Sequence, residues 1–123
     1  MTSTIRFIDA NIFILNVNNH TFLDSLNPSE YATSILVLSE TFHKLTKRYK
    51  EQGEIFNYIR SIMGCVHVYD VTQNDFFLAM TSSLQININD KIHIATMKRN
   101  NITVILSYDT DFDKDKTIQG EEI

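Results

Sequence analysis

The 123-residue sequence lacks the features of a secreted or membrane protein. It has a single cysteine, Cys65, so no disulfide can form within the chain, and we expect this residue to be a small buried side chain in a strand. No apolar run approaches the ~20 residues of a membrane-spanning helix, and the N-terminus lacks the charged and then apolar pattern of a signal peptide. These absences predict a cytoplasmic protein.

The sequence also lacks an excess of positive charge. Its formal net charge is −4, which by itself argues against a nucleic-acid partner, because phosphate binding normally requires a basic surface. That objection weakens if several acidic residues bind divalent cations, which would invert the local charge. With 43% hydrophobic and 21% charged residues, no internal repeat and no low-complexity segment, residues 1–123 are expected to form a single globular domain.

Short β-branched and aromatic segments alternate with stretches of helical periodicity, which is typical of an α/β fold. We expect strands at residues 4–8, 65–71, 102–106 and 117–119. We expect helices at residues 31–50, 54–63, 76–84 and 91–99, the first being the longest. The predicted architecture is a three-layer sandwich around a central, mainly parallel sheet of four to five strands.

Acidic residues occur where this architecture would bring them together. Asp9 follows the first strand and Asp109 follows the third, and right-handed crossovers place the ends of parallel strands on one edge of a sheet. Glu40 shares a helix face with apolar residues, where an unpaired charge is costly. Asp90 opens the helix expected at residues 91–99. The pattern predicts that these four acids meet at one edge of the sheet.

Each acid also has a purely structural interpretation. Asp9 and Asp90 would serve as helix caps, a role that aspartate fills well. Glu40 would pair with Lys44 one turn later on a solvated face, which is worth only ~0.3–0.5 kcal/mol. The aspartates of segment 109–111 would form a polar turn after a strand. These interpretations predict scattered acids, whereas the topology predicts a cluster.

A cluster of carboxylates indicates metal chemistry. Neighbouring carboxylates repel one another, so the metal-free site is expected to contain at least one raised pKa. Mg²⁺ or Mn²⁺ would supply the compensating charge, because these hard ions bind oxygen ligands and retain several water molecules. Water oriented or deprotonated in such a site can attack a phosphate whose charge the ions stabilise. The chemistry predicted for this cluster is phosphodiester hydrolysis.

Four segments of the sequence resemble the motifs of PIN-domain nucleases, in the order and spacing of the VapC toxins of type II toxin–antitoxin pairs. They are IRFIDANIF, SILVLSE, NINDKIHIAT and VILSYDTDFD. Each motif is weak alone, but the four occur in the family's order and each falls on the expected element. The resemblance covers nearly the whole chain.

The resemblance implies a Mg²⁺- or Mn²⁺-dependent endoribonuclease that forms a homodimer and is inhibited by a partner antitoxin. It assigns the catalytic and metal-binding roles to Asp9, Glu40, Asp90 and Asp109, and it leaves open whether Asp109 or Asp111 is the fourth ligand. Asn11 completes the D-x-N pattern that begins at Asp9, and Ser107 matches a small hydroxyl residue that steadies a ligand or a water molecule. There are two alternatives. One is a PIN-domain nuclease that acts in RNA processing or on DNA structures and is not a toxin, and the other is a catalytically weak PIN module that binds RNA or protein.

Basic and histidine residues near these motifs have two interpretations. Lys44 and Lys47 would either bind RNA phosphates beside the groove or be solvated charges at a helix end. His93 lies one turn after Asp90, but its apolar neighbours favour a packed histidine, and the carboxylate site does not require it. His43, one turn after Glu40, would face the groove more readily.

Overall fold

The computed structural model describes residues 4–49 and 51–122, and its centre is a five-stranded parallel sheet. The strands lie in the order β3-β2-β1-β4-β5. In chain order they are β1 (Arg6–Ile8), β2 (Tyr31–Ser34), β3 (His67–Tyr69), β4 (Val104–Leu106) and β5 (Gln119–Glu121). Since β1 lies in the middle, the chain after β1 builds the sheet outward on one side and then on the other.

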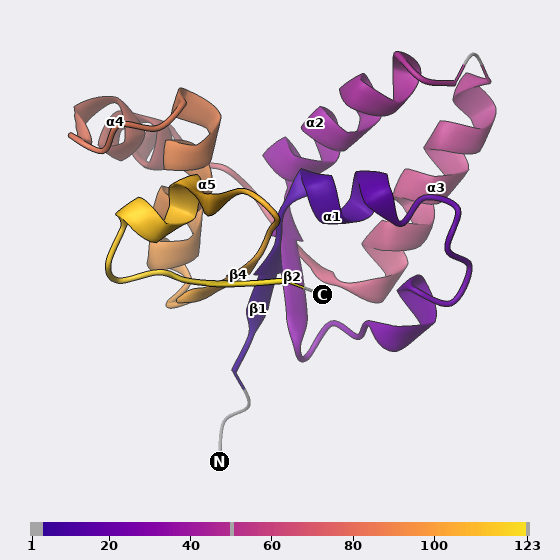
Figure 1. Cartoon of the computed structure of the whole chain (residues 1–123), viewed down its shortest axis with the longest axis horizontal. Helices are drawn as coiled ribbons and strands as arrows, with labels where there is room; N and C mark the ends of the chain where they lie inside the picture. The colour runs from indigo at the N-terminus through magenta and orange to yellow at the C-terminus, as the bar shows by residue number, and fades with distance from the viewer. Residues whose placement is uncertain (1–3, 50, 123) are drawn as a thin grey trace.

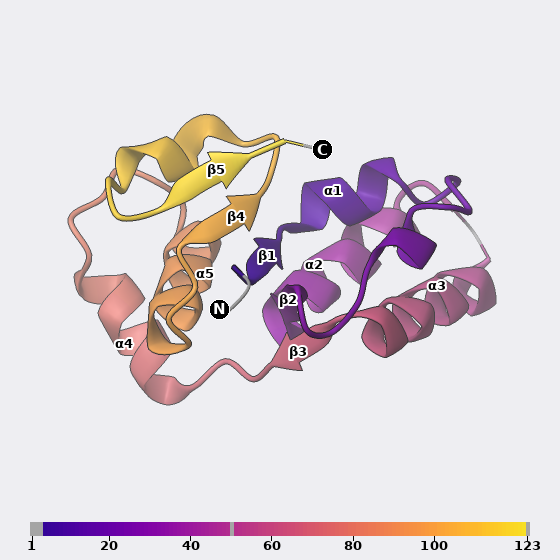
Figure 2. The same cartoon turned by 90° about the horizontal axis from the view of Figure 1, so that it is seen from below.

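Helices cover both faces of this sheet (Figures 1 and 2). One layer consists of α1 (Ala10–Leu15), α2 (Ile35–Thr46) and α3 (Gln52–Cys65). The other contains α4 (Gln73–Thr81) and α5 (Ile88–Arg99). Short 3-10 helices are η1 (Leu23–Ser25) and η2 (Thr110–Lys114). The predicted three-layer α/β sandwich with a parallel sheet is confirmed.

The core lies between the sheet and its two helical layers. Phe7 of β1 and Ile105 of β4 are fully buried, as expected for central parallel strands that are covered on both faces. Val37 and Leu45 of α2 pack from one layer and Met97 of α5 from the other, all of them fully buried. No helix in the described part of the chain is both long and apolar enough to cross a membrane.

The expected helix at residues 31–50 is wrong in its first turn. Tyr31–Ser34 form β2, which pairs with β1 and β3, and the Thr33 hydroxyl donates to the Ile8 carbonyl at 2.8 Å. Ser34 then caps α2 by accepting a hydrogen bond from the Val37 amide at 3.2 Å. Helix α2 ends at Thr46, whereas its expected end, Lys50, lies outside the described residues. The helix expected to be the longest is also shorter than α3, with 12 residues against 14.

Several further boundaries differ from the prediction, among them that of the helix expected at residues 76–84, which is α4 (Gln73–Thr81). Cys65 is the last residue of α3 and is half-buried, so it is not a buried strand residue, and the strand that follows covers only His67–Tyr69. Helix α5 begins at Ile88, before Asp90, because Asn87 is its cap. The last strand is β5, which begins where the expected strand at residues 117–119 ends.

Candidate metal centre

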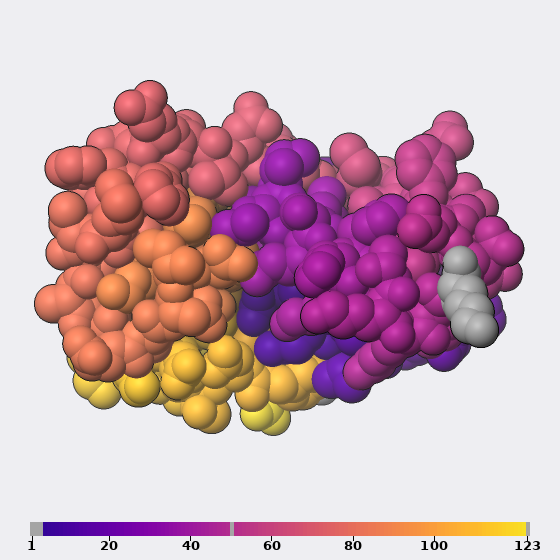
Figure 3. All heavy atoms as spheres, turned by 90° about the horizontal axis from the view of Figure 1, so that it is seen from above, coloured from indigo at the N-terminus to yellow at the C-terminus, as the bar shows by residue number. Residues whose placement is uncertain are grey.

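Four elements bring the predicted acids to the edge of the sheet where the strands end. Asp9 directly follows β1, and Asp109 lies three residues after β4. Glu40 comes from α2 and Asp90 from the first turn of α5, in opposite helical layers. Figure 3, seen from this end of the sheet, shows atoms of the N-terminal part in indigo between the orange atoms of the α4–α5 half and the purple atoms of α2.

Both oxygens of Asp9 are held in place. Oδ1 accepts a hydrogen bond from the Ala10 amide at 2.8 Å, which caps α1. Oδ2 accepts from the Ser107 hydroxyl at 2.8 Å and from the Asn11 side-chain amide at 3.3 Å. The capping interpretation of Asp9 is therefore correct, but it describes only one oxygen. Asn11 and Ser107, the predicted supporting residues, contact the other.

Ser107 connects Asp9 to the next acid along the edge. Besides donating to Asp9, the Ser107 Oγ accepts hydrogen bonds from the Asp109 amide at 3.0 Å and from the Asn11 side chain at 3.1 Å. Asp109 in turn caps η2 by accepting from the Asp111 amide at 2.9 Å. One buried hydroxyl thus fixes the end of β1 relative to the turn after β4.

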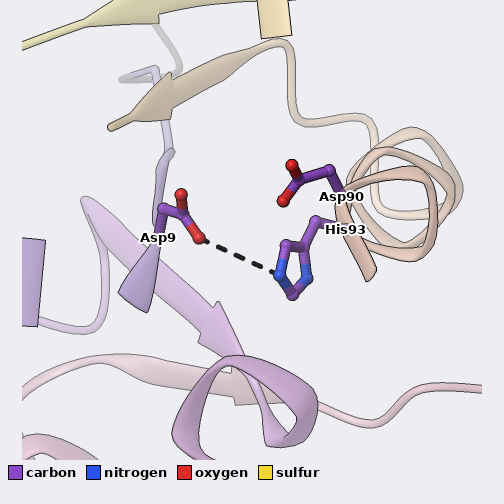
Figure 4. Close-up of side chains that lie close together, drawn as sticks. All are labelled: Asp9, Asp90 and His93. Carbon is purple, nitrogen blue, oxygen red and sulfur yellow. Dashed lines mark ion pairs between the residues drawn. The ribbon is translucent and has the colours of Figure 1, made fainter. Parts of the chain in front are cut away.

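Two groups of side chains at this edge could each hold a cation. The first contains Asp9, Asp90 and His93, and in Figure 4 these three side chains point toward one another from β1 and α5. The second contains Asp90, Asp109 and Asp111. Within each group the potential ligand atoms lie within 4.8 Å of one another, and Asp90 belongs to both. Because the second group contains both Asp109 and Asp111, it does not decide which of them is the fourth ligand.

Glu40 belongs to neither group but is tied to the first through His93. Its Oε1 lies 2.7 Å from His93 Nε2, and its Oε2 accepts a hydrogen bond from the Asn89 side chain at 3.2 Å. The alternative pair with Lys44 does not form among the described residues, and the Lys44 side chain is exposed. Glu40 is partnered, as expected, but it is half-buried, with a side chain that is 19% exposed.

The sequence interpretation undervalued His93. Its side chain is completely buried, as expected of a packed histidine, yet it also contacts the acids: Nε2 lies 3.9 Å from Asp9 Oδ1 as well as close to Glu40. The signal that could have identified it is its i+3 position relative to Asp90, because residues three apart share a helix face. By contrast, His43 is exposed on α2 and contacts none of the acids in the described part of the chain.

Crowding and burial shift the pKa values of the acids. Burial, reinforced by the charge of Asp9, raises the pKa of Asp90 to about 6. Burial also raises the pKa of Asp9. For Glu40, burial acts to raise the pKa, but the hydrogen bonds from His93 and Asn89 help to hold that pKa below the ordinary value. The expectation that the metal-free cluster contains at least one raised pKa is confirmed.

The donor set fits a hard divalent cation. Asp9, Asp90, Asp109 and Asp111 offer carboxylate oxygens, which suit Mg²⁺ and Mn²⁺, and a bound cation would offset the burial and the neighbouring negative charges that raise the pKa of Asp90. A separate cavity of about 500 Å³ beside α4 and α5 has no such cluster among the residues that the structure describes. Its acids, Asp75 and Asp115, are already paired with Arg99 and Lys98.

A parallel α/β sandwich with acids from several elements at one edge of the sheet defines the class of this protein. The family model of the PIN domain matches residues 6–116. The chain therefore belongs to the PIN-domain family, as its four motifs indicated. No curated protein matched the chain.

Several solved structures have a similar fold. VapC20 of Mycobacterium tuberculosis, described as a sarcin–ricin loop cleaving toxin, is 18% identical over 88% of this chain and 92% of that chain, with a TM-score of 0.70. A chain of DNA-bound VapBC from Salmonella typhimurium is 13% identical, with 97% and 98% covered and a TM-score of 0.75. A chain of VapBC2 from Rickettsia felis, bound to a promoter DNA fragment, is 16% identical, with 97% of this chain and 98% of that chain covered and a TM-score of 0.71. At these identities, the likeness establishes the fold.

Proposed function

We propose that this protein is a divalent-metal-dependent endoribonuclease of the VapC type that hydrolyses phosphodiester bonds in RNA. The observation that carries this proposal is the convergence of Asp9, Asp90 and Asp109 at one edge of the sheet, with Glu40 tied to the same cluster through His93. Capping roles account for single acids such as Asp9 and Asp109, but they do not explain why acids from different elements lie together at one edge. Membership of the PIN-domain family supports a nuclease over other uses of a carboxylate cluster.

We assign Asp9, Glu40, Asp90 and Asp109 to the metal-binding and catalytic set, with Asp111 as the alternative fourth ligand. Bound Mg²⁺ or Mn²⁺ would supply Lewis-acid stabilisation of the phosphate and would lower the pKa of the attacking water. The protein's own contribution is to fix the carboxylates. Asp9 is held through both oxygens, and the Ser107 hydroxyl joins it to the segment that contains Asp109.

RNA would approach a surface whose acidic charge the cation offsets. Lys44 and Lys47 extend α2 beyond Glu40, and both are exposed. We propose that they bind phosphates that flank the scissile bond and so supply local positive charge on a protein whose formal net charge is −4.

The natural regulator would be an antitoxin. The chains of similar fold include members of VapBC complexes from Salmonella typhimurium and Rickettsia felis, which supports a protein partner for this chain. We further propose that the active form is a homodimer. A small gene directly upstream that encodes a DNA-binding protein would favour the toxin assignment over an RNA-processing or DNA-structure nuclease.

The proposal is tested by incubating purified protein with mixed RNAs in the presence of Mg²⁺, Mn²⁺ or a chelator. The wild type is expected to cleave RNA only with a divalent ion. Loss of a residue that hydrogen-bonds to a metal ligand typically lowers the rate by about 10- to 100-fold. Asp9→Asn changes a proposed ligand itself, so it should lower the rate by more than that. Asp24→Asn, at an exposed acid of η1, is the matched control and should cleave normally. Chelator-resistant cleavage, or an unimpaired Asp9→Asn variant, would contradict the proposal.

A further inference from the structure

His93 presents its two ring nitrogens to very different surroundings. The ring is completely buried on α5, and its centroid lies 6.0 Å from that of Phe7 of β1. Nε2 faces two carboxylates, at 2.7 Å from Glu40 Oε1 and 3.9 Å from Asp9 Oδ1. Nδ1 is buried and has no hydrogen-bond partner among the described residues.

This asymmetry decides which nitrogen carries the hydrogen. A buried N–H without an acceptor loses its hydrogen bonds to water and gains nothing in return, so a hydrogen on Nδ1 is disfavoured. Carboxylate oxygens accept hydrogen bonds, so the short contact between Nε2 and Glu40 requires a donor on the ring. His93 therefore donates from Nε2 to Glu40 Oε1.

While Nε2 donates to Glu40, it cannot also bind a cation. An imidazole nitrogen binds a cation through its lone pair, and a protonated Nε2 has no lone pair to offer. The nitrogen that keeps its lone pair, Nδ1, is buried. In this arrangement the group of Asp9, Asp90 and His93 presents two carboxylates, the donor type that hard divalent ions prefer.

Asn89 completes the arrangement around Glu40. Its side-chain amide donates a hydrogen bond to Glu40 Oε2 at 3.2 Å, while His93 Nε2 lies 2.7 Å from Glu40 Oε1. Asn89 and His93 are four residues apart and so lie on one face of α5. The two donors clamp both oxygens of a glutamate that comes from α2, in the opposite helical layer.

We propose that His93 is a positioning residue, which with Asn89 orients the Glu40 carboxylate at the edge of the acidic cluster and does not itself bind the cation. The catalytic consequence rests on the proposed nuclease function, whereas the hydrogen-bond arrangement does not. Glutamate has several rotatable bonds, so an unclamped Glu40 would sample orientations away from the cluster.

Two substitutions at His93 distinguish the role of its hydrogen-bond donor from the role of the volume that its ring fills. In His93→Gln, the side-chain amide can replace the Nε2 hydrogen, whereas His93→Leu keeps similar volume but offers no donor. His93→Leu should lower kcat for RNA cleavage by about 10- to 100-fold with KM little changed, and His93→Gln should restore most of the loss. His20→Leu and His20→Gln, at an exposed histidine outside the site, are the matched controls. Equal effects of the two substitutions at His93, whether both harmful or both silent, would overturn the proposal.

Two measurements are independent of cleavage. Long-range ¹H–¹⁵N correlation spectra of the metal-free wild type should show the His93 hydrogen on Nε2, and a hydrogen on Nδ1 would overturn the proposal. The Kd for Mn²⁺ of His93→Gln should equal that of the wild type, whereas a ligand role would weaken binding strongly. These results remain decisive if His93→Leu does not fold. If the wild type cleaves no RNA, the nuclease function fails, while the spectra and the Mn²⁺ titration still test the clamp.

Discussion

Asp90 is the residue at which the demands of folding and of metal binding conflict most. It is buried, its pKa is raised to about 6, and the carboxylates of Asp9, Asp109 and Glu40 contribute to that rise. A raised pKa means that folding disfavours the ionised carboxylate, so the metal-free protein at neutral pH is less stable than it would be with a neutral side chain at this position. A bound cation would remove the penalty.

Asp90→Asn is therefore expected to stabilise the metal-free protein. The gain in the free energy of unfolding at pH 7 should be about 1–2 kcal/mol, less than the full shift implies because nearby solvent screens the charge. Urea unfolding in the presence of a chelator measures it, with Asp24→Asn as a control expected to change stability by less than about 0.5 kcal/mol. A variant less stable than the wild type would contradict this expectation, because it would show that the hydrogen bond that Asp90 Oδ2 accepts from the Asn87 side chain at 2.8 Å outweighs the cost of the buried charge.

Ser107 provides a second test at the scale of single residues. Its hydroxyl contacts Asp9, Asn11 and the Asp109 amide, so its removal loosens two proposed ligands without changing any charge. Ser107→Ala should weaken Mn²⁺ binding by about 10- to 100-fold, as expected for a hydrogen-bond partner of metal ligands. Ser61→Ala, at an exposed hydroxyl on α3, is the control. Unchanged Mn²⁺ affinity in Ser107→Ala would remove Ser107 from the site.

At the scale of elements, one ion pair fixes α4 against α5. Asp75 is fully buried in the first turn of α4 and accepts hydrogen bonds from Arg99 at 3.0 and 3.1 Å. Arg99 also donates to the Asp70 carbonyl at 2.6 Å, after β3. Burial alone would raise the pKa of Asp75, but its hydrogen bond with Arg99 helps to lower that pKa below the ordinary value. The pair is therefore a source of stability that depends on pH.

Arg99→Met should destabilise the protein by about 2–4 kcal/mol at pH 7, because it leaves a buried carboxylate without its partner. Since the folded-state pKa of Asp75 is lowered, the stabilisation is present above the unfolded-state pKa and is lost as pH falls through the folded-state pKa. The difference between variant and wild type should therefore shrink toward pH 3. Urea unfolding at pH 7 and at pH 3 tests this expectation. The control is Arg60→Met, at an exposed arginine of α3. A pH-independent difference would argue against the ion pair.

The elements also show where sequence patterns stop being informative. The strand–helix alternation and the position of Asp9 after a buried strand were sufficient to predict the parallel sheet and the edge at which the acids lie. Strand β2 was missed because Ser34 ends the strand and caps α2 without an intervening turn, so Tyr31–Ser34 read as the first turn of a helix. Its strand conformation depends on pairing with β1 and β3, which the local sequence does not contain.

The same limit applies to the site. Asp9, Asp90 and Asp109 could be predicted to meet, because topology alone places strand ends and helix starts at one edge. The contact between Glu40 and His93 could not, since it depends on how α2 and α5 face each other across the sheet. His93 has apolar neighbours in the sequence, and only the folded chain shows that one of its nitrogens faces carboxylates.

At the scale of the whole molecule, the fold gathers acids from four parts of the chain at one edge of the sheet. The formal net charge is −4, and acids from β1, α2, α5 and the segment after β4 meet at one edge. A divalent cation would link both helical layers through the sheet. Binding at 100 times Kd would add about 2.7 kcal/mol to the stability of the folded state.

The most direct test of this account is a calorimetric titration of the metal-free protein with Mn²⁺. We expect the wild type and Asp24→Asn to bind Mn²⁺ with the same Kd, and Asp9→Asn and Asp90→Asn to lose most of the affinity although both remain folded. Equal binding by all four proteins, or no binding by the wild type, would contradict the claim that these carboxylates share a cation.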